Sequence, residues 1–215
     1  MKKVGLVVTF LIVLLIGVIA WKFIFPKKDT DQAPKPQGLA VSKHSEAFNV
    51  SMNKALNAYY DLTEAFVNWD TAKVTSTLAA FKIRVDSIQI PEMQKDSDIY
   101  QTAFITWESI KADIQGMQMD TSLYERREDL NMLSDNMFNL LRIVKYDAAK
   151  VYYHECPMAL NNNESKAFWL SSTGDRQNRR NPYLGLHDPK FGKSMLDCGT
   201  TRDSINFSAD TSGKK

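Results

Sequence analysis

Residues 45–69, SEAFNVSMNKALNAYYDLTEAFVNW, decide the fold expected for this chain. The large apolar residues of this stretch recur at alternating intervals of four and three positions. They are Phe48, Met52, Ala55, Tyr59, Leu62, Phe66 and Trp69. This spacing places them along one face of an α-helix. The stretch therefore predicts an amphipathic helix whose apolar stripe must pack against other helices.

Three further stripes of the same kind follow up to residue 147. The second comprises Val74, Leu78, Phe81, Val85 and Ile88, the third Ala103, Trp107, Ile110, Ile114 and Met117, and the fourth Leu130, Leu133, Met137, Leu140 and Val144. Asp70 is a predicted cap of the second helix, and Pro91 is expected to end it. Asp96 or Ser97 opens the third helix, and Asp120 and Thr121 open the fourth. Because the connections are short, sequence neighbours should be antiparallel, and we expect an all-α, up-down four-helix bundle.

The helical pattern breaks near Tyr153, and turn residues such as Gly174, Pro182 and Gly185 are frequent up to residue 199. The same segment holds several large apolar residues, among them Phe168 and Trp169. We therefore expect an irregular segment that is ordered by packing on the bundle.

This segment also gathers the soft metal-ligand chemistry of the chain. The five candidate ligands are Cys156, Cys198, Met158, Met195 and His154, and the two cysteines are the only ones in the protein. Thiolate, thioether and imidazole are ligands that favour Cu(I) and, to a lesser degree, Zn(II). The cluster predicts a site for Cu(I) or another soft ion, with no other cofactor.

A disulfide between Cys156 and Cys198 is the competing interpretation. Two cysteines in one small domain usually pair in an oxidising compartment. Closing a loop of about 42 residues would stabilise the fold by about 4 kcal/mol on the chain-entropy model. The sequence leaves three interpretations of the cysteines open: the metal site, the disulfide and two independent free thiols.

The N-terminus predicts a membrane anchor. Residues 4–25 are apolar except for Thr9 and Lys22, and as a helix they would span about 33 Å, which matches the hydrocarbon core of a bilayer. No small-residue cleavage site follows, so we expect residues 1–28 to stay as a transmembrane anchor. The balance of lysines around the span does not fix its orientation.

We expect a linker over residues 29–43, a helical domain over residues 44–205 and a disordered tail over residues 206–215. Residues 1–28 hold five of the 27 basic residues and none of the 25 acidic ones, so the rest of the chain is net acidic by three. Such a balance argues against nucleic-acid binding. The expected location is the inner membrane, with a single pass and the domain in the periplasm.

The motifs of the C-terminal segment resemble those of a bacterial family of uncharacterised domains known as DUF3347. The similar stretches are residues 153–159 (YHECPMA), 169–171 (WLS), 181–185 (NPYLG) and 195–199 (MLDCG), together with 53–56 and 65–70 of the first helix. Members occur alone or at the end of periplasmic adaptor subunits of copper- and silver-type efflux pumps, which implies metal handling. The strands of such an adaptor are absent from the sequence pattern here, and the Arg-rich stretch 176–180 looks like an insertion.

The resulting hypothesis is a membrane-anchored, extracytoplasmic domain that binds a soft, copper-type metal and sequesters it or delivers it to an efflux system. The alternative is a non-catalytic interaction module, stapled by a Cys156–Cys198 disulfide, that docks on a partner in a membrane complex. An enzyme is not expected, because the sequence has no CxxC redox pair, no glycine-rich phosphate-binding loop and no pattern of a catalytic triad.

Overall fold

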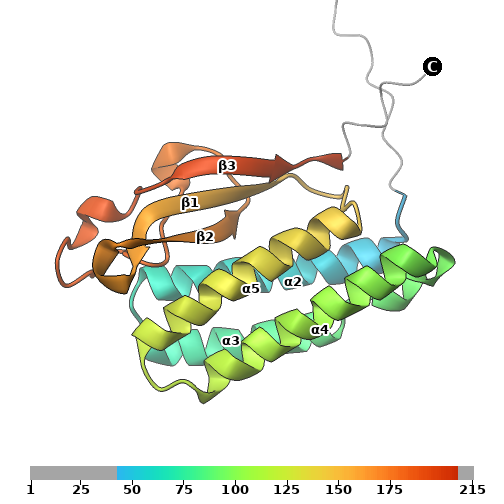
Figure 1. Cartoon of the computed structure of the whole chain (residues 1–215), viewed down its shortest axis with the longest axis horizontal. Coiled ribbons are helices and arrows are strands. Elements are labelled where there is room, and N and C mark those ends of the chain that lie inside the picture. Colours follow the sequence, from blue (N-terminus) through green and yellow to red (C-terminus); the bar gives the residue numbers. More distant parts are fainter. Residues whose placement is uncertain (1–42, 208–215) are drawn as a thin grey trace, which may run out of the picture. The chain divides into compact units, whose positions relative to one another are not determined.

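The computed structural model describes residues 43–207, which form four helices followed by a small β-sheet (Figure 1). The helices are α2 (Glu46–Val67), α3 (Thr71–Asp86), α4 (Ser97–Met119) and α5 (Leu123–Ile143), and the 3₁₀ helix η1 (Ile90–Lys95) joins α3 to α4. These are the four helices predicted between residues 45 and 147. The predicted anchor at residues 1–28 lies outside the described residues. Among the helices of residues 43–207, none combines the length and apolarity that a membrane crossing requires.

The helix starts follow local capping chemistry. The side chain of Asp70 accepts a hydrogen bond from the backbone of Lys73, and Asp96 caps α4 in the same way, as predicted. Helix α5 begins slightly later than expected, because Ser122 is its cap and forms a capping box with Glu125.

The predicted stripes form the core between the helices. Every residue of the four apolar stripes is buried except two tryptophans, which lie at the margin of the core. Trp69 lies beyond the end of α2 with a positive φ of 55°. Trp107 is half-buried, and its indole N–H donates a hydrogen bond of 2.9 Å to the carbonyl of Val85. The periodicity of the sequence therefore identified the helical core correctly.

The prediction of an all-α fold is wrong. After α5 the chain forms three antiparallel strands, β1 (Val151–Leu160), β2 (Ser165–Ser171) and β3 (Thr200–Ile205), in the order β2-β1-β3. Strand β1 is central and is covered on both faces, so its residues do not alternate between apolar and polar. Without that alternation, the segment was expected to be irregular.

The sheet lies over α2 and α5 (Figure 1). Tyr153 on β1 stacks on Phe138 of α5 at 4.2 Å between ring centroids and on Phe168 of β2 at 4.9 Å. Residues Tyr153 and Phe168 occupy one face of the sheet, because side chains alternate along a strand and the paired residues Glu155 and Phe168 point the same way. That face packs on the helices.

The segment between β2 and β3, residues 172–199, covers the other face of the sheet. Within it, Arg180 makes a bidentate ion pair with Glu64 of α2, at 2.6 and 2.5 Å, and Arg176 pairs with Asp197 at 3.2 Å. The Arg-rich stretch 176–180 thus anchors the segment 172–199 to α2 through Arg180. Through Arg176 it also links two parts of that segment to each other.

Candidate functional site

The site begins on the covered face of β1. His154 and Cys156 are two residues apart on this strand and therefore point to the same side, opposite Trp169 and Ala167 of β2. Both side chains are fully buried. The segment 172–199 closes over them and brings Cys198 to Cys156, from a position far along the chain.

A glycine allows this approach. Gly199 follows Cys198 with a φ of +120°, and a Cβ at this position would collide with the backbone carbonyl of Glu155. Any other residue would push the segment away from β1 and separate the two cysteines.

Asn181 holds the segment beside the cysteines, a role that the sequence did not reveal. It is fully buried, and its side-chain amide donates to the carbonyl of Cys198 at 3.3 Å, while its oxygen accepts from the backbone of Tyr183 and Leu184. Its own backbone N–H donates to Leu196 at 2.7 Å. The Asn-Pro-Tyr motif is therefore a positioning element for Cys198.

The two cysteines are free thiols in hydrogen-bond contact with each other. A hydrogen bond from Cys198 lowers the pKa of Cys156 to about 7, with further help from the backbone N–H of Met158 and the amide of Asn181, although burial opposes it. The same hydrogen bond and burial raise the pKa of Cys198 above its usual value. Near pH 7 Cys156 is therefore about half ionised, while Cys198 keeps its proton.

Neither ring nitrogen of His154 is free to bind an ion beside the thiols, because both are within hydrogen-bond distance of other groups. Its Nε2 lies 2.7 Å from the hydroxyl of Ser171 and 3.0 Å from the carbonyl of Thr173, and its Nδ1 lies 3.1 Å from the hydroxyl of Thr201. Burial lowers its pKa to about 4, so the ring is neutral. In this arrangement His154 fastens β1 to its neighbours, and the prediction that it is a metal ligand gains no support.

The two methionines flank the thiol pair along the chain. The backbone N–H of Met158 points to the Cys156 sulfur, and the carbonyl of Met195 accepts the N–H of Cys198 at 3.0 Å. Both side chains are partly buried against the core. Their role as thioether ligands stays a prediction.

Within residues 43–207, no group of three or more His, Cys, Asp and Glu residues is arranged to hold a metal ion. Of the five predicted ligands, the structure therefore brings only Cys156 and Cys198 together. The two methionines lie two and three residues from these cysteines in the sequence. Trp169 and Tyr183 are buried packing residues, and His187 is exposed.

The comparison with known families matches residues 55–148 to DUF3347, described as a protein of unknown function. This confirms the resemblance for the helical part, from within α2 to just beyond α5. The matched range ends before β1, so the thiol pair lies outside it. No curated protein matches the chain, and no solved structure matches it.

Proposed function

Residues 55–148 match the model of the DUF3347 family, and from that premise we propose that this protein binds a soft, copper-type metal ion through Cys156 and Cys198. The protein would sequester the ion or pass it to an efflux system outside the cytoplasm, held at the membrane by its N-terminal segment. The family resemblance supplies the context of metal export.

The observation that carries the proposal is the contact between the two thiols. A metal ion binds thiolates and displaces their protons, so the lowered pKa of Cys156, about 7, reduces the cost of forming the first thiolate near neutral pH.

The donor set favours Cu(I) over Zn(II). Zinc in structural sites takes four ligands, and no third imidazole, thiolate or carboxylate joins the two thiols among residues 43–207. Soft sulfur ligands select Cu(I), and a thioether from Met158 or Met195 would complete the site without adding charge.

Access is possible from one side. Cys156 is fully buried, whereas Cys198 is half-buried and follows a short 3₁₀ helix, η4 (Lys193–Met195), at the surface. We expect the ion to enter and leave at Cys198, as transfer to a partner protein would require.

The same contact also favours the second candidate, a Cys156–Cys198 disulfide that staples a non-catalytic interaction module. Two free thiols in contact need only small movements to reach the S–S distance of a disulfide, about 2.05 Å. In that state the protein would bind no soft metal.

The deciding experiment is an anaerobic Cu(I) titration of the full-length chain in mild detergent, against a competing chelator. Reduced and oxidised protein are compared with the Cys156→Ser/Cys198→Ser double variant. We expect the reduced protein to bind one ion tightly and the other two samples to bind none. Absence of binding by the reduced protein would refute the metal proposal.

Met158→Leu and Met195→Leu test the thioethers, and Met119→Leu is the matched control. Met119 is 76% exposed at the end of α4 and lies outside the segment that carries the cysteines. A loss of affinity at Met158 or Met195, but not at Met119, would assign the remaining ligand. A stable Cys156–Cys198 bond under periplasm-like conditions, found by mass spectrometry, would favour the interaction module.

A further inference from the structure

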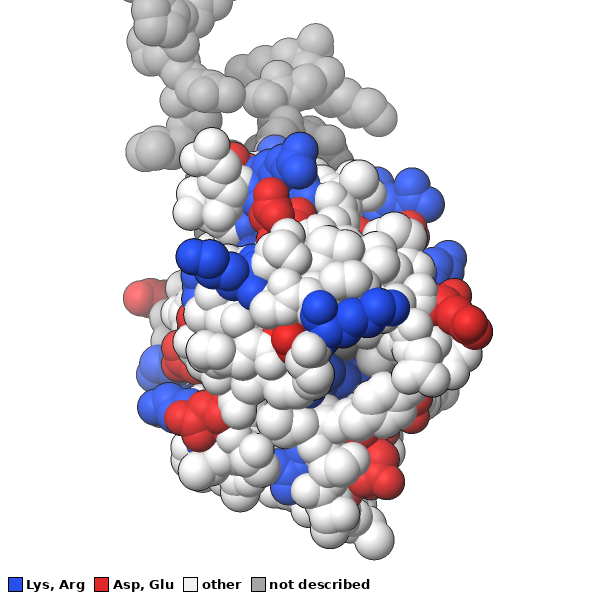
Figure 2. Space-filling model, turned by 90° about the vertical axis from the view of Figure 1, so that its left-hand side faces the viewer, with Lys and Arg blue, Asp and Glu red and all other residues white. Residues whose placement is uncertain are grey.

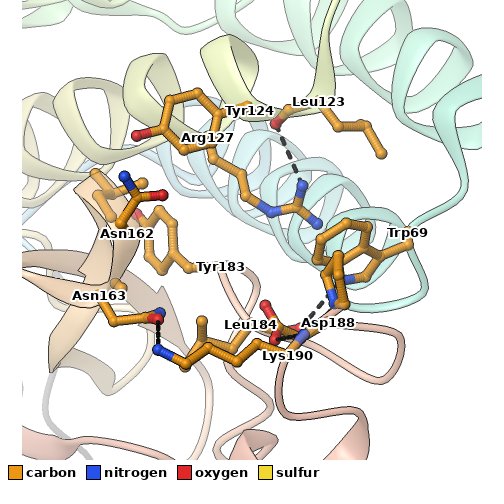
Figure 3. A pocket seen from close by; sticks show the side chains of 13 residues that line it. Trp69, Leu123, Tyr124, Arg127, Asn162, Asn163, Tyr183, Leu184, Asp188 and Lys190 are labelled. Atoms are coloured by element: carbon orange, nitrogen blue, oxygen red, sulfur yellow. Dashed lines mark hydrogen bonds between the residues drawn. The ribbon is translucent and has the colours of Figure 1, made fainter.

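A cavity of about 420 Å³ opens where α2 ends and α5 begins, apart from the thiol pair (Figure 3). Its wall combines Trp69 after α2, Tyr124 and Arg127 in the first turns of α5, the turn between β1 and β2, and residues 183–190. Neither cysteine lines it. On the end of the molecule shown in Figure 2, the surface is hollowed near its centre, with basic side chains beside the hollow.

Arg127 is the unusual group in this wall. The residue is only 4% exposed, and its guanidinium donates to three backbone carbonyls, those of Pro182, Leu123 and Phe66, at 3.2–3.3 Å. It also stacks at 4.0 Å over the ring of Trp69. Two of its five N–H groups remain for other acceptors.

The charge of Arg127 lacks a close counter-ion. Over residues 43–207, no carboxylate lies within ion-pair distance of its guanidinium. A buried cation is costly unless an anion balances it. Burial accordingly lowers the pKa of Arg127 to about 10, and only the more distant Asp188 and Tyr183 oppose this.

A second cation stands on the opposite wall of the cavity. The ammonium of Lys190 donates to the side-chain oxygen of Asn163 at 3.2 Å (Figure 3). Asp188, the one carboxylate of the lining, already accepts from the backbone N–H groups of Lys190 and Phe191 through a single oxygen. The lining therefore carries a net positive charge.

The turn that presents Asn163 is conformationally unusual. Asn161, Asn162 and Asn163 have φ values of 49°, 55° and 74°, three successive residues in the left-handed region. Asparagine tolerates this region better than most residues, but a run of three stores strain. The strained turn brings the amides of Asn162 and Asn163 to the cavity, where that of Asn163 accepts from Lys190 and donates to the carbonyl of Met158.

The rest of the lining is apolar or aromatic. Besides Trp69 it includes Leu123, Leu160, Leu184 and the rings of Tyr124 and Tyr183. Tyr124 is 49% exposed, so a ligand could cover its ring. A concave apolar wall with a few convergent polar groups is the usual form of a small-molecule site.

We propose that this cavity binds a small organic carboxylate. The carboxylate would accept hydrogen bonds from the guanidinium of Arg127 and the ammonium of Lys190, and the apolar body would lie against Trp69 and Tyr124. A singly charged carboxylate balances the buried guanidinium, whereas a doubly charged phosphate would be repelled by Asp188 more strongly than a carboxylate is.

The test uses the reduced full-length chain and three fluorinated probes followed by ¹⁹F NMR. They are 4-fluorophenylacetate, the uncharged 2-(4-fluorophenyl)ethanol and 4-fluorobenzylphosphonate. We expect the carboxylate to bind and the alcohol to bind at least about tenfold more weakly, because a charge-assisted hydrogen bond is lost. Equal binding of the alcohol, tighter binding of the phosphonate, or no binding of the carboxylate would overturn the proposal.

Substitutions locate the bound probe. Lys190→Met and Tyr124→Ala change exposed residues of the lining and should weaken binding by about threefold or more, since each removes one contact. Lys193→Met, an exposed lysine outside the lining, is the matched control and should change nothing. Arg127→Lys should weaken binding further, and it is interpreted only if its melting temperature matches the parent. An equal effect of Lys193→Met and Lys190→Met would show that binding is not in this cavity.

Discussion

The backbone N–H of Leu170 on β2 donates a hydrogen bond of 3.1 Å to the hydroxyl of Tyr59 on α2. That hydroxyl also lies 2.7 Å from the hydroxyl of Ser134 on α5. Strand β2 is an edge strand, and its outward N–H groups need partners because they are buried. The backbone N–H of Phe168 likewise donates a hydrogen bond to the side-chain oxygen of Asn131, at 2.8 Å. The helices therefore complete the sheet edge with side chains.

Replacing Tyr59 with phenylalanine should destabilise the domain by about 1–3 kcal/mol, because a buried N–H of the sheet edge loses its acceptor. Chemical denaturation measures the effect. Tyr60→Phe is the control: Tyr60 is only partly buried, and no hydrogen bond of its hydroxyl is found among residues 43–207. An equal loss in both variants would mean that the hydroxyl of Tyr59 does not support the edge.

The helices could be predicted from sequence because each buries one face, so that apolar residues recur with the helical period. The sheet could not be predicted in the same way. Strand β1 is buried on both faces, and it contains Pro157, a residue that cannot donate to a strand ladder. Pro157 lies where the pairing of β1 with β2 shifts register, between Cys156 and Leu160. Strand β3 is polar and largely exposed, which resembles a loop.

A hairpin signal was nevertheless present. Val151, Tyr152 and Tyr153 are β-formers, the run of three asparagines from Asn161 is turn-forming, and residues 168–170 are again aromatic and apolar. The thiol pair was predictable because only two cysteines exist. The roles of His154 and Asn181 were not, since their partners come from distant parts of the chain and depend on the strand register.

The reduced thiol pair should titrate in two separate steps. Thiolate absorbance of the wild-type protein should rise with a midpoint near pH 7, from Cys156. In Cys198→Ala the donated hydrogen bond is lost, so the pKa of Cys156 should rise toward the ordinary thiol value of about 8.5. The Cys156→Ala variant should show no step near pH 7. A midpoint that stays near 7 in Cys198→Ala would mean that Cys198 does not stabilise the thiolate.

His154 should remain neutral well below the usual range of histidine. Its pKa is lowered to about 4 by burial, while an unfolded histidine titrates near 6.5. The unfolded state therefore binds a proton first, and stability is lost as the pH falls from 6.5 through 4. Ring chemical shifts in NMR spectra, recorded from pH 7 to pH 4, measure this directly. A midpoint above pH 6 for His154 would contradict a buried ring whose two nitrogens are both hydrogen-bonded.

Asp129 on α5 should weaken the fold at neutral pH. Its pKa is raised to about 7 by burial, by a hydrogen bond and repulsion from Asp120, and by repulsion from Asp113 and Glu128. One of its oxygens is buried without a hydrogen-bond partner. Between about pH 4 and pH 7 the native state keeps this proton while the unfolded state has lost it, so stability falls as the pH rises through this window.

Asp129→Asn removes the charge and retains the shape of the side chain. We expect the melting temperature of the variant to exceed that of the wild type at pH 8 and to equal it at pH 4. The reason is that the buried position disfavours only the ionised carboxylate, which is present at pH 8 and protonated at pH 4. Glu128→Gln, a change at the exposed neighbouring residue, is the matched control and should have a smaller effect at both pH values. A gain of the same size at pH 4 and pH 8 would show that the benefit comes from packing and not from the carboxylate's charge.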